Sequence, residues 1–216
     1  EYQSVLSSVV TSSMEIGVRM RLQCRVLSER NNLEGDFLVL NEVSVDRGPS
    51  PYLTNVECFC DDRYVTMCEG DGIIVATPTG STAYSLAAGG SMVHPDVPGM
   101  LLTPICVHSL AFRPSVFPDS VTLRLQVPND SRVAAWCNFD GRNAMPLKKG
   151  WCVSVTASKW PIPIVTRTGM DYDWFNGVTE CLNWNNRKAQ NSGFQRPNSG
   201  ADAPPPVAKE KHGESK

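Results

Sequence analysis

The sequence predicts a mainly β fold: an antiparallel β-sandwich-like domain with one short helix inside it and a helix at either end. Many short segments alternate apolar and polar residues with period two, as strands with one buried face do. Clusters of Gly, Pro, Asp and Asn separate these segments at regular intervals, which is typical of sandwiches rather than of alternating strand–helix units. A chain of 216 residues is also long enough to bury a substantial core.

The two ends of the chain are predicted to be helical. Residues 1–14 carry an apolar stripe at helical spacing, so 1–16 are interpreted as the end of an upstream helix and a linker. The β-rich domain is expected over 17–170. Residues 171–188 form a helix whose apolar face is too broad for packing on one sheet alone, and it should dock on something more. The polar, proline-containing segment 189–216 is predicted to be a disordered tail.

Strands are expected where apolar residues alternate or cluster between turn signals. These segments are 18–26, 37–45, 56–60, 64–68, 73–77, 101–106, 121–127, 134–139 and 151–155. Pro104 interrupts one of them and predicts a break, at an edge or bend of the sheet. Tight connections are expected at 46–51, 61–63 and 140–141, where Asp, Gly and Pro favour turns.

The stretch 70–90 is the one around which the rest is organised. Its strand, 73–77, ends at Pro78, and the turn Thr79–Thr82 places three hydroxyls around a glycine. A helix over 83–88 should follow, with Ser81 or Thr82 as its N-cap and Gly89–Gly90 at its end. A helix N-terminus after such a turn suits a phosphate or a base edge. Ordinary capping explains the same spacing, and without a Walker A or G-x-G-x-x-G pattern it is the preferred interpretation.

Composition excludes several classes of function. The chain has 20 basic and 22 acidic residues, and the basic ones are scattered, so a nucleic-acid partner is not expected. No apolar run reaches about 18 residues, so no membrane partner is expected either. The eight cysteines lie mostly in strand-like runs, and we interpret them as reduced core thiols of an intracellular protein. A metal site at Cys58 and Cys60 is the minority interpretation, because no second pair follows at zinc spacing.

Three segments together resemble a known family. They are Asn41-Glu42-Val43 with Asp46-Arg47-Gly48-Pro49, then Gly70-Asp71-Gly72 through Thr77-Pro78-Thr79-Gly80-Ser81-Thr82-Ala83-Tyr84, and finally Phe139-Asp140-Gly141. In this order they resemble the second, β-rich domain of NAD kinases, eukaryotic and plant-like ones in particular, over about residues 1–188. NAD kinases phosphorylate the 2′-hydroxyl of the adenosine ribose of NAD to give NADP.

The resemblance implies a set of NAD-binding residues. They are Asn41, Glu42, Asp71, Thr79, Thr82, Ala83, Tyr84 and Asp140. The Asn-Glu pair would contact ribose and base, and a carboxylate accepts two hydroxyl protons well. Asp71 would accept from a ligand amide or amino group, although Asp-Gly also favours plain turns. For Tyr84 and Asp140, helix packing and a β-turn are the competing structural interpretations.

The family's catalytic Gly-Gly-Asp-Gly-Thr motif is absent from this sequence. We therefore expect no catalytic residue in this chain. ATP and Mg²⁺ are expected as cofactors of the complete enzyme. The 171–188 helix is expected to dock on the missing N-terminal domain. The chain is then the NAD-binding part of a kinase, inactive alone. The alternative is a non-catalytic dinucleotide-binding or oligomerisation module that modulates a full-length kinase; a related lipid kinase is less favoured. The resemblance also implies a homo-oligomer, in the cytoplasm or, after loss of a transit peptide, in a plastid or mitochondrion.

Overall fold

The computed structural model describes residues 2–11, 14–166 and 170–182, and β-strands dominate them. The strands are β1 (Glu15–Arg19), β2 (Leu22–Leu27), β3 (Leu33–Val39), β4 (Glu42–Asp46), β5 (Thr54–Cys60), β6 (Arg63–Gly70), β7 (Gly72–Ala76), β8 (Gly99–Ile105), β9 (Ser115–Pro118), β10 (Leu123–Gln126), β11 (Ala135–Phe139), β12 (Arg142–Leu147), β13 (Cys152–Ala157) and β14 (Ile162–Thr166). The helices are α1 (Tyr2–Val10), the 3-10 helix η1 (Thr79–Thr82), α2 (Tyr84–Ala87) and α3 (Met170–Leu182).

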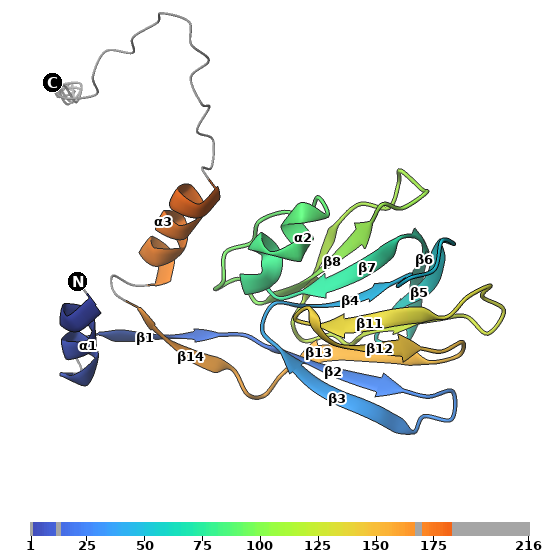
Figure 1. Ribbon diagram of the computed structural model, residues 1–216, viewed down its shortest axis with the longest axis horizontal. Coiled ribbons are helices and arrows are strands. Elements are labelled where there is room, and N and C mark those ends of the chain that lie inside the picture. Colours follow the sequence, from blue (N-terminus) through green and yellow to red (C-terminus); the bar gives the residue numbers. More distant parts are fainter. Residues whose placement is uncertain (1, 12–13, 167–169, 183–216) are drawn as a thin grey trace, which may run out of the picture.

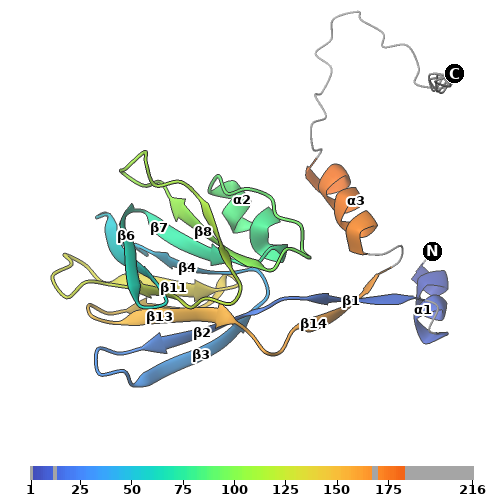
Figure 2. The same ribbon diagram turned by 180° about the vertical axis from the view of Figure 1, so that it is seen from behind.

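Two six-stranded antiparallel sheets form a sandwich (Figure 1). The first sheet has the order β3-β2-β13-β10-β5-β6 and the second β12-β11-β4-β7-β8-β9. A separate ribbon of β1 and β14 extends from the sandwich and carries α1 and α3 at its far end, as both ribbon views show (Figures 1 and 2). The predicted fold class is confirmed. The strands β9, β12 and β14 were not expected from the sequence pattern.

The core lies between the two sheets and takes one residue in two from each strand. Its fully buried members include Leu22, Val26, Val43, Val45, Ile73, Val75, Leu123, Leu125, Val153 and Val155. The rings of Phe37 in β3 and Phe139 in β11 stack with their centroids 4.0 Å apart, and so join the two sheets near the start of β4. A second apolar cluster lies on the outer face of the second sheet, where Ala88 and Val93 pack on Ile74. The α2 segment therefore covers that face.

Two predicted strands are each two strands in the structure. The segment 37–45 is divided at Leu40–Asn41, because the chain there crosses from the first sheet to the second. The segment 18–26 is divided at Met20–Arg21, since β1 belongs to the ribbon and β2 to the first sheet. Period-two alternation continues through such a corner, and the pattern therefore hides it.

The expected break at Pro104 is wrong. Strand β8 runs unbroken from Gly99 to Ile105, and all seven residues are buried. The pairing of β9 with β8 ends at Leu102, so Pro104 has a paired strand only on its β7 side. A position with one open side is where a sheet tolerates proline.

The expected N-cap at Ser81 or Thr82 is also wrong. The residue before α2 is Ala83, and no side chain caps the helix. The fully buried Ser81 hydroxyl instead donates to the Val93 carbonyl at 3.1 Å and accepts from its N–H at 2.9 Å. The predicted end of the helix at Gly89 is confirmed, with φ +88° in the region that favours glycine.

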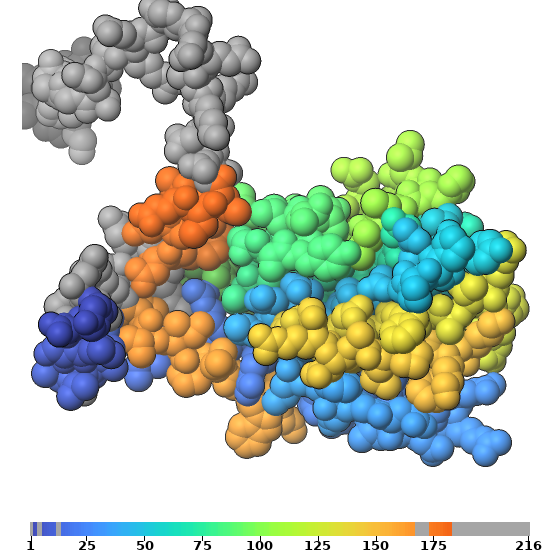
Figure 3. All heavy atoms as spheres, viewed as in Figure 1, coloured from blue at the N-terminus to red at the C-terminus, as the bar shows by residue number. Residues whose placement is uncertain are grey.

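Helix α3 contacts the segment that follows α2. The ring of Trp174 meets His94 edge to face with centroids 4.9 Å apart, and Figure 3 shows α3 against the α2 segment. Phe175 remains half exposed, so part of the apolar face of α3 is not covered. The predicted helix end at 183–188 and the tail 189–216 lie outside the described residues. Among the described helices, none has the length and apolarity to cross a membrane.

Candidate functional site

The predicted binding residues other than Asp71 gather where β4 begins and where β7 and β11 end, at the edge of the second sheet that these strand ends form. Strand β4 begins there at Glu42, which pairs with Ala76 at the end of β7, while Val43 pairs with Phe139 at the end of β11. Antiparallel order thus brings the start of one strand beside the ends of two others. The turns that follow those two strands carry the remaining candidates, including Tyr84 and Asp140.

Glu42 is the chemically unusual residue of this edge. It is only 9% exposed, and its Oε2 atom is buried with no hydrogen-bond partner. Burial, more than the neighbouring Asp140 carboxylate, raises the pKa of Glu42, and a hydrogen bond from the Tyr84 backbone N–H works in the opposite direction. A buried carboxylate oxygen without a donor is costly in the free protein, and a ligand hydroxyl at this position would satisfy it.

Asn41 lies in the corner between the sheets, held from the β7 side by Thr77. The Thr77 hydroxyl donates to the Leu40 carbonyl at 2.6 Å, and the Thr77 N–H donates to the Asn41 carbonyl at 2.8 Å. The same hydroxyl accepts from the Gly80 N–H at 3.0 Å. A Cβ atom on Gly80 would lie 2.1 Å from the Asn41 carbonyl oxygen, so only glycine fits this approach.

Asp140 holds the corner from the other side. Its Oδ2 accepts from the Leu40 N–H at 2.7 Å, and its Oδ1 accepts from the N–H groups of Asn41 and Glu42 at 2.8 and 3.1 Å. The Asp140 N–H donates to the Glu42 carbonyl at 3.0 Å. Asp140 has a left-handed φ of +50°, a conformation that Asp and Asn tolerate better than most residues. Both of its carboxylate oxygens are therefore already bonded to the protein backbone.

Tyr84 connects the two ends of the site. Burial raises the pKa of its phenol, and Asp46, Cys106, Asp71 and Glu42 add to the rise in that order. The phenol therefore lies in a negative field that extends along the outer face of β4. Carboxylates placed in this way accept hydrogen bonds from ligand hydroxyl, amide and amino groups.

Asp71 lies at the opposite end of β4 from Glu42. Gly72 pairs with Asp46, four residues along the strand from Glu42, which is a separation of roughly 13 Å. Arg47 Nε donates to Asp71 Oδ1 at 2.8 Å, and Arg47 Nη1 donates to the Ser50 carbonyl at 2.6 Å. The structure therefore places this predicted residue beside the same face, but not beside the Asn-Glu pair.

Thr79, Thr82 and Ala83 border the site on the side of α3. The Thr82 hydroxyl donates to the Thr79 carbonyl at 3.3 Å, and the Ala83 N–H donates to the Gly80 carbonyl at 2.9 Å. Thr82 also lines a mainly apolar hollow of about 360 Å³ whose opposite wall is α3, with Trp174 among its residues. The hydroxyl and backbone donors of this turn are thus partly used within the turn itself.

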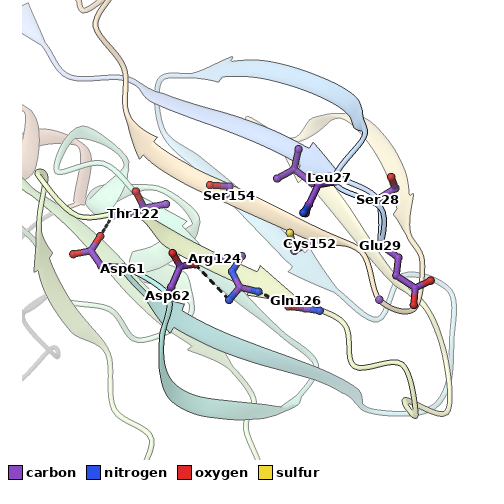
Figure 4. A pocket seen from close by; sticks show the side chains of 12 residues that line it. Leu27, Ser28, Glu29, Asp61, Asp62, Thr122, Arg124, Gln126, Cys152 and Ser154 are labelled. Carbon is purple, nitrogen blue, oxygen red and sulfur yellow. Dashed lines mark hydrogen bonds and ion pairs between the residues drawn. The ribbon is translucent and has the colours of Figure 1, made fainter.

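A larger hollow, of about 610 Å³, lies away from the predicted residues on the outer face of the first sheet (Figure 4). The guanidinium of Arg124 stands over the Phe59 ring at 3.9 Å and pairs with Asp62 Oδ1 at 3.7 Å. Its charge is therefore matched locally, while Glu29 and Asp61 add negative charge to the lining. Its size does not make it the functional site, because no predicted residue faces it.

The described residues contain no group of three or more His, Cys, Asp or Glu side chains placed to hold a metal ion. What the edge of the second sheet offers is hydrogen-bond acceptance by carboxylates on a rigid frame.

Thr77, Gly80 and Asp46 belong to the site but were not among the predicted binding residues. Thr77 and Gly80 fix the corner. Among the neighbouring charges, that of Asp46 raises the pKa of the Tyr84 phenol most. Their signals were in the sequence, since all three lie inside the segments that carry the family resemblance. Their roles depend on contacts with residues far along the chain, which spacing does not reveal.

Comparisons with known proteins identify the family of this chain. Residues 40–167 match the family model described as the ATP-NAD kinase C-terminal domain. The chain is 52% identical over 176 residues to NAD kinase 2, chloroplastic, of Arabidopsis thaliana, covering 81% of this chain and 18% of that protein. It is 49% identical over 194 residues to probable NAD kinase 1 of Oryza sativa subsp. japonica, covering 88% of this chain and 36% of that protein. The chain thus spans well under half of either plant relative.

Solved structures resemble this fold. The crystal structure of yeast NADH kinase complexed with NADH superposes with a TM-score of 0.81 at 34% identity, covering 88% of this chain and 57% of that one. An NAD kinase from Archaeoglobus fulgidus, solved in complex with ATP, shares the fold with a TM-score of 0.68 at 23% identity, covering 82% of this chain and 66% of that one.

Proposed function

Since this chain belongs to the ATP-NAD kinase family through its C-terminal domain, we propose that it supplies the NAD-binding part of an enzyme that phosphorylates NAD to NADP. The observation that carries the proposal is the buried Oε2 atom of Glu42, which has no hydrogen-bond partner. The two vicinal hydroxyls of a ribose are donors of the required kind, and charge-assisted bonds of this type contribute about 1.5–3 kcal/mol each. Asn41, beside it, provides a carboxamide that both donates and accepts.

The length of the site supports a dinucleotide rather than a single nucleoside. Glu42 and Asp71 lie near opposite ends of β4, roughly 13 Å apart along the strand. An elongated ligand with a nucleoside at each end reaches both carboxylates, and Tyr84 lies between them. Asp71 would then accept from an amide or amino group, provided that its ion pair with Arg47 rearranges.

The turn that precedes α2 borders the ligand on the side of α3. We propose that Thr79, Thr82 and Ala83 contact the base edge through hydroxyl and backbone groups, because Thr82 faces the hollow next to α3. For Asp140 a direct contact would have to use the one acceptor site that its three backbone hydrogen bonds leave, on Oδ2.

Phosphoryl transfer needs parts that this sequence does not contain. The Gly-Gly-Asp-Gly-Thr motif, which the family resemblance associates with ATP and Mg²⁺, is not in this sequence. We therefore propose that ATP and Mg²⁺ bind residues outside this 216-residue chain, and that the chain alone has no kinase activity. The half-exposed Phe175 of α3 is apolar surface on which a further domain would dock.

Isothermal titration calorimetry of this chain with NAD tests the proposal. Saturable binding at sub-millimolar NAD is expected, and Glu42→Ala should weaken it by about one to two decades, the equivalent of one lost charge-assisted bond. Asp130→Asn, an exposed acid away from the site, is the control and should bind as the wild type does. A folded wild-type chain without saturable binding would refute the assignment of the NAD site to this chain.

A second candidate function is a non-catalytic dinucleotide-binding or oligomerisation module. The half-exposed Phe175 of α3 supports this candidate as well, because apolar surface on this helix can also meet a second subunit. Adding the chain to a full-length kinase and measuring NADP formation distinguishes the two candidates, because only the module changes the partner's rate at saturating NAD.

We also propose that the protein is a homo-oligomer. Leu110 is 88% exposed, and Ile16 and Trp160 are each 70% exposed, so apolar surface remains for a further subunit or domain to cover. Light scattering of the purified chain tests this. The eight free cysteines fit a reducing compartment, for which we propose the cytoplasm, with the plastid as the alternative because the Arabidopsis relative is named chloroplastic.

A further inference from the structure

Asp140 is connected to the corner of the sandwich more completely than a turn residue needs to be. One carboxylate accepts three consecutive backbone N–H groups, those of Leu40, Asn41 and Glu42, at 2.7, 2.8 and 3.1 Å. These residues precede Asp140 by about a hundred positions, so the contact is purely tertiary. Three charge-assisted bonds of this kind fix the backbone direction at the point where β4 begins.

The carbonyls of the same corner are held from the opposite side. Thr77 bonds the carbonyls of Leu40 and Asn41, and Gly80 leaves just enough room for the Asn41 carbonyl. The backbone N–H groups of the corner are thus held by Asp140, which follows β11, and its carbonyls by Thr77, which follows β7. The backbone of a corner fixed on both sides cannot move without breaking several hydrogen bonds, so the directions in which the Asn41 and Glu42 side chains leave the backbone are set.

We propose that Asp140 is the positioning residue of the NAD site and acts on the ligand only through Asn41 and Glu42. It fixes the backbone of both residues, and it places a second negative charge near the Glu42 carboxylate. The proposal rests on the proposed function in one respect, that Glu42 binds the dinucleotide. It assigns Asp140 a role different from the direct ligand contact that the family resemblance implied, because three of the roughly four acceptor sites of its carboxylate are taken by backbone N–H groups.

The second negative charge has a measurable consequence. Two neighbouring groups act on Glu42. The carboxylate of Asp140, from the turn after β11, disfavours the ionised form of Glu42, and the backbone N–H of Tyr84, from α2, favours it. Burial first and the Asp140 charge second raise the pKa of Glu42. Only the ionised carboxylate accepts both ribose hydroxyls, so NAD affinity should fall as pH decreases through that raised pKa. Removing the Asp140 charge should move this acid limb to lower pH.

Two substitutions separate the two parts of the proposal. Asp140→Asn removes the charge, tolerates the left-handed φ of +50°, and keeps one acceptor oxygen for the N–H groups of Asn41 and Glu42. Asp140→Ala removes the charge and all three hydrogen bonds. NAD affinity is measured by calorimetry from about pH 4 upward, starting below the usual glutamate pKa of about 4.3. Asp130→Asn changes net charge equally and serves as the matched control.

For Asp140→Asn we expect an acid limb at lower pH and an affinity at neutral pH within about threefold of the wild type. For Asp140→Ala we expect a loss of at least about tenfold at neutral pH. An Asp140→Asn protein whose acid limb stays with the wild type would overturn the proposal. So would an affinity loss at every pH as large as that of Glu42→Gln, because that result indicates a direct contact. If Asp140→Ala does not fold, the acid limb of Asp140→Asn still tests the proposal.

A measurement without ligand keeps the two proposals apart. The pKa of Glu42, followed through its carboxyl ¹³C shift by NMR in the absence of NAD, should be lower in Asp140→Asn than in the wild type and unchanged in Asp130→Asn. An unchanged Glu42 pKa in Asp140→Asn refutes the charge coupling. If instead Glu42→Gln binds NAD as the wild type does, the NAD-binding role of Glu42 fails while the coupling stands.

Discussion

Gly80→Ala should damage the site through a single methyl group. The added Cβ would lie 2.1 Å from the Asn41 carbonyl oxygen and 2.6 Å from its carbonyl carbon, while an ordinary contact begins near 3.4 Å. The turn and the corner would therefore have to separate by about 1.3 Å. The Thr77 hydroxyl joins these same two segments, so the separation strains or breaks its bonds as well.

The expected cost is of the order found for overpacked cores, about 1–3 kcal/mol, or a melting temperature lower by roughly 3–10 °C. The effect on NAD should be larger in proportion, because the displaced corner carries Asn41 and Glu42. We expect the dissociation constant for NAD to rise by about ten- to a hundredfold. Differential scanning fluorimetry and calorimetry on the same preparation measure both quantities.

Gly89→Ala is the control for this prediction. Gly89 has φ +88°, so alanine there is strained by about 1–2 kcal/mol, but its Cβ would meet nothing within 4 Å. It should lower the melting temperature and leave NAD affinity unchanged. The reasoning is refuted if Gly80→Ala binds NAD with wild-type affinity, or loses no more affinity than Gly89→Ala does.

Three further predictions concern stability and reactivity. Without NAD, Glu42→Gln should melt at a higher temperature than the wild type at pH 8 and at the same temperature near pH 4. The raised folded-state pKa of Glu42 means that its ionised form destabilises the folded state, an effect that is absent below the unfolded pKa of about 4.3 and complete above the folded pKa. A wild type that is more stable than Glu42→Gln at pH 8 would contradict this. Thr77→Val should lower the free energy of unfolding, measured in urea, by about 1–3 kcal/mol, because the Gly80 N–H loses its buried acceptor. A decrease of less than about 0.5 kcal/mol would show that another group replaces this hydrogen bond. Iodoacetamide at neutral pH should label the exposed Cys106 and Cys181 in the folded chain, while Cys68, whose pKa burial raises to about 12, should be labelled only after unfolding, as peptide mass spectrometry would report.

The sequence alone determined the class of fold and most of the strands. Alternation with period two is a local property of a chain with one buried face, and β2, β5 and β11 follow it with every second residue buried. The glycine at the end of α2 was equally local, since a left-handed φ needs glycine wherever it occurs. The family resemblance likewise depended on the order of short segments, which needs no structure.

Only the tertiary structure decided how the site is built. Leu40–Asn41 is a corner because the two flanking strands belong to different sheets, and nothing in their alternation records which sheet each one joins. Asp140 reaches that corner across about a hundred residues, and Asp71 lies at the other end of β4 because of the register of β4 with β7. Local spacing fixes which residues share a strand face. Partners, burial and the free oxygen of Glu42 depend on strand register and sheet packing, which are properties of the whole folded chain.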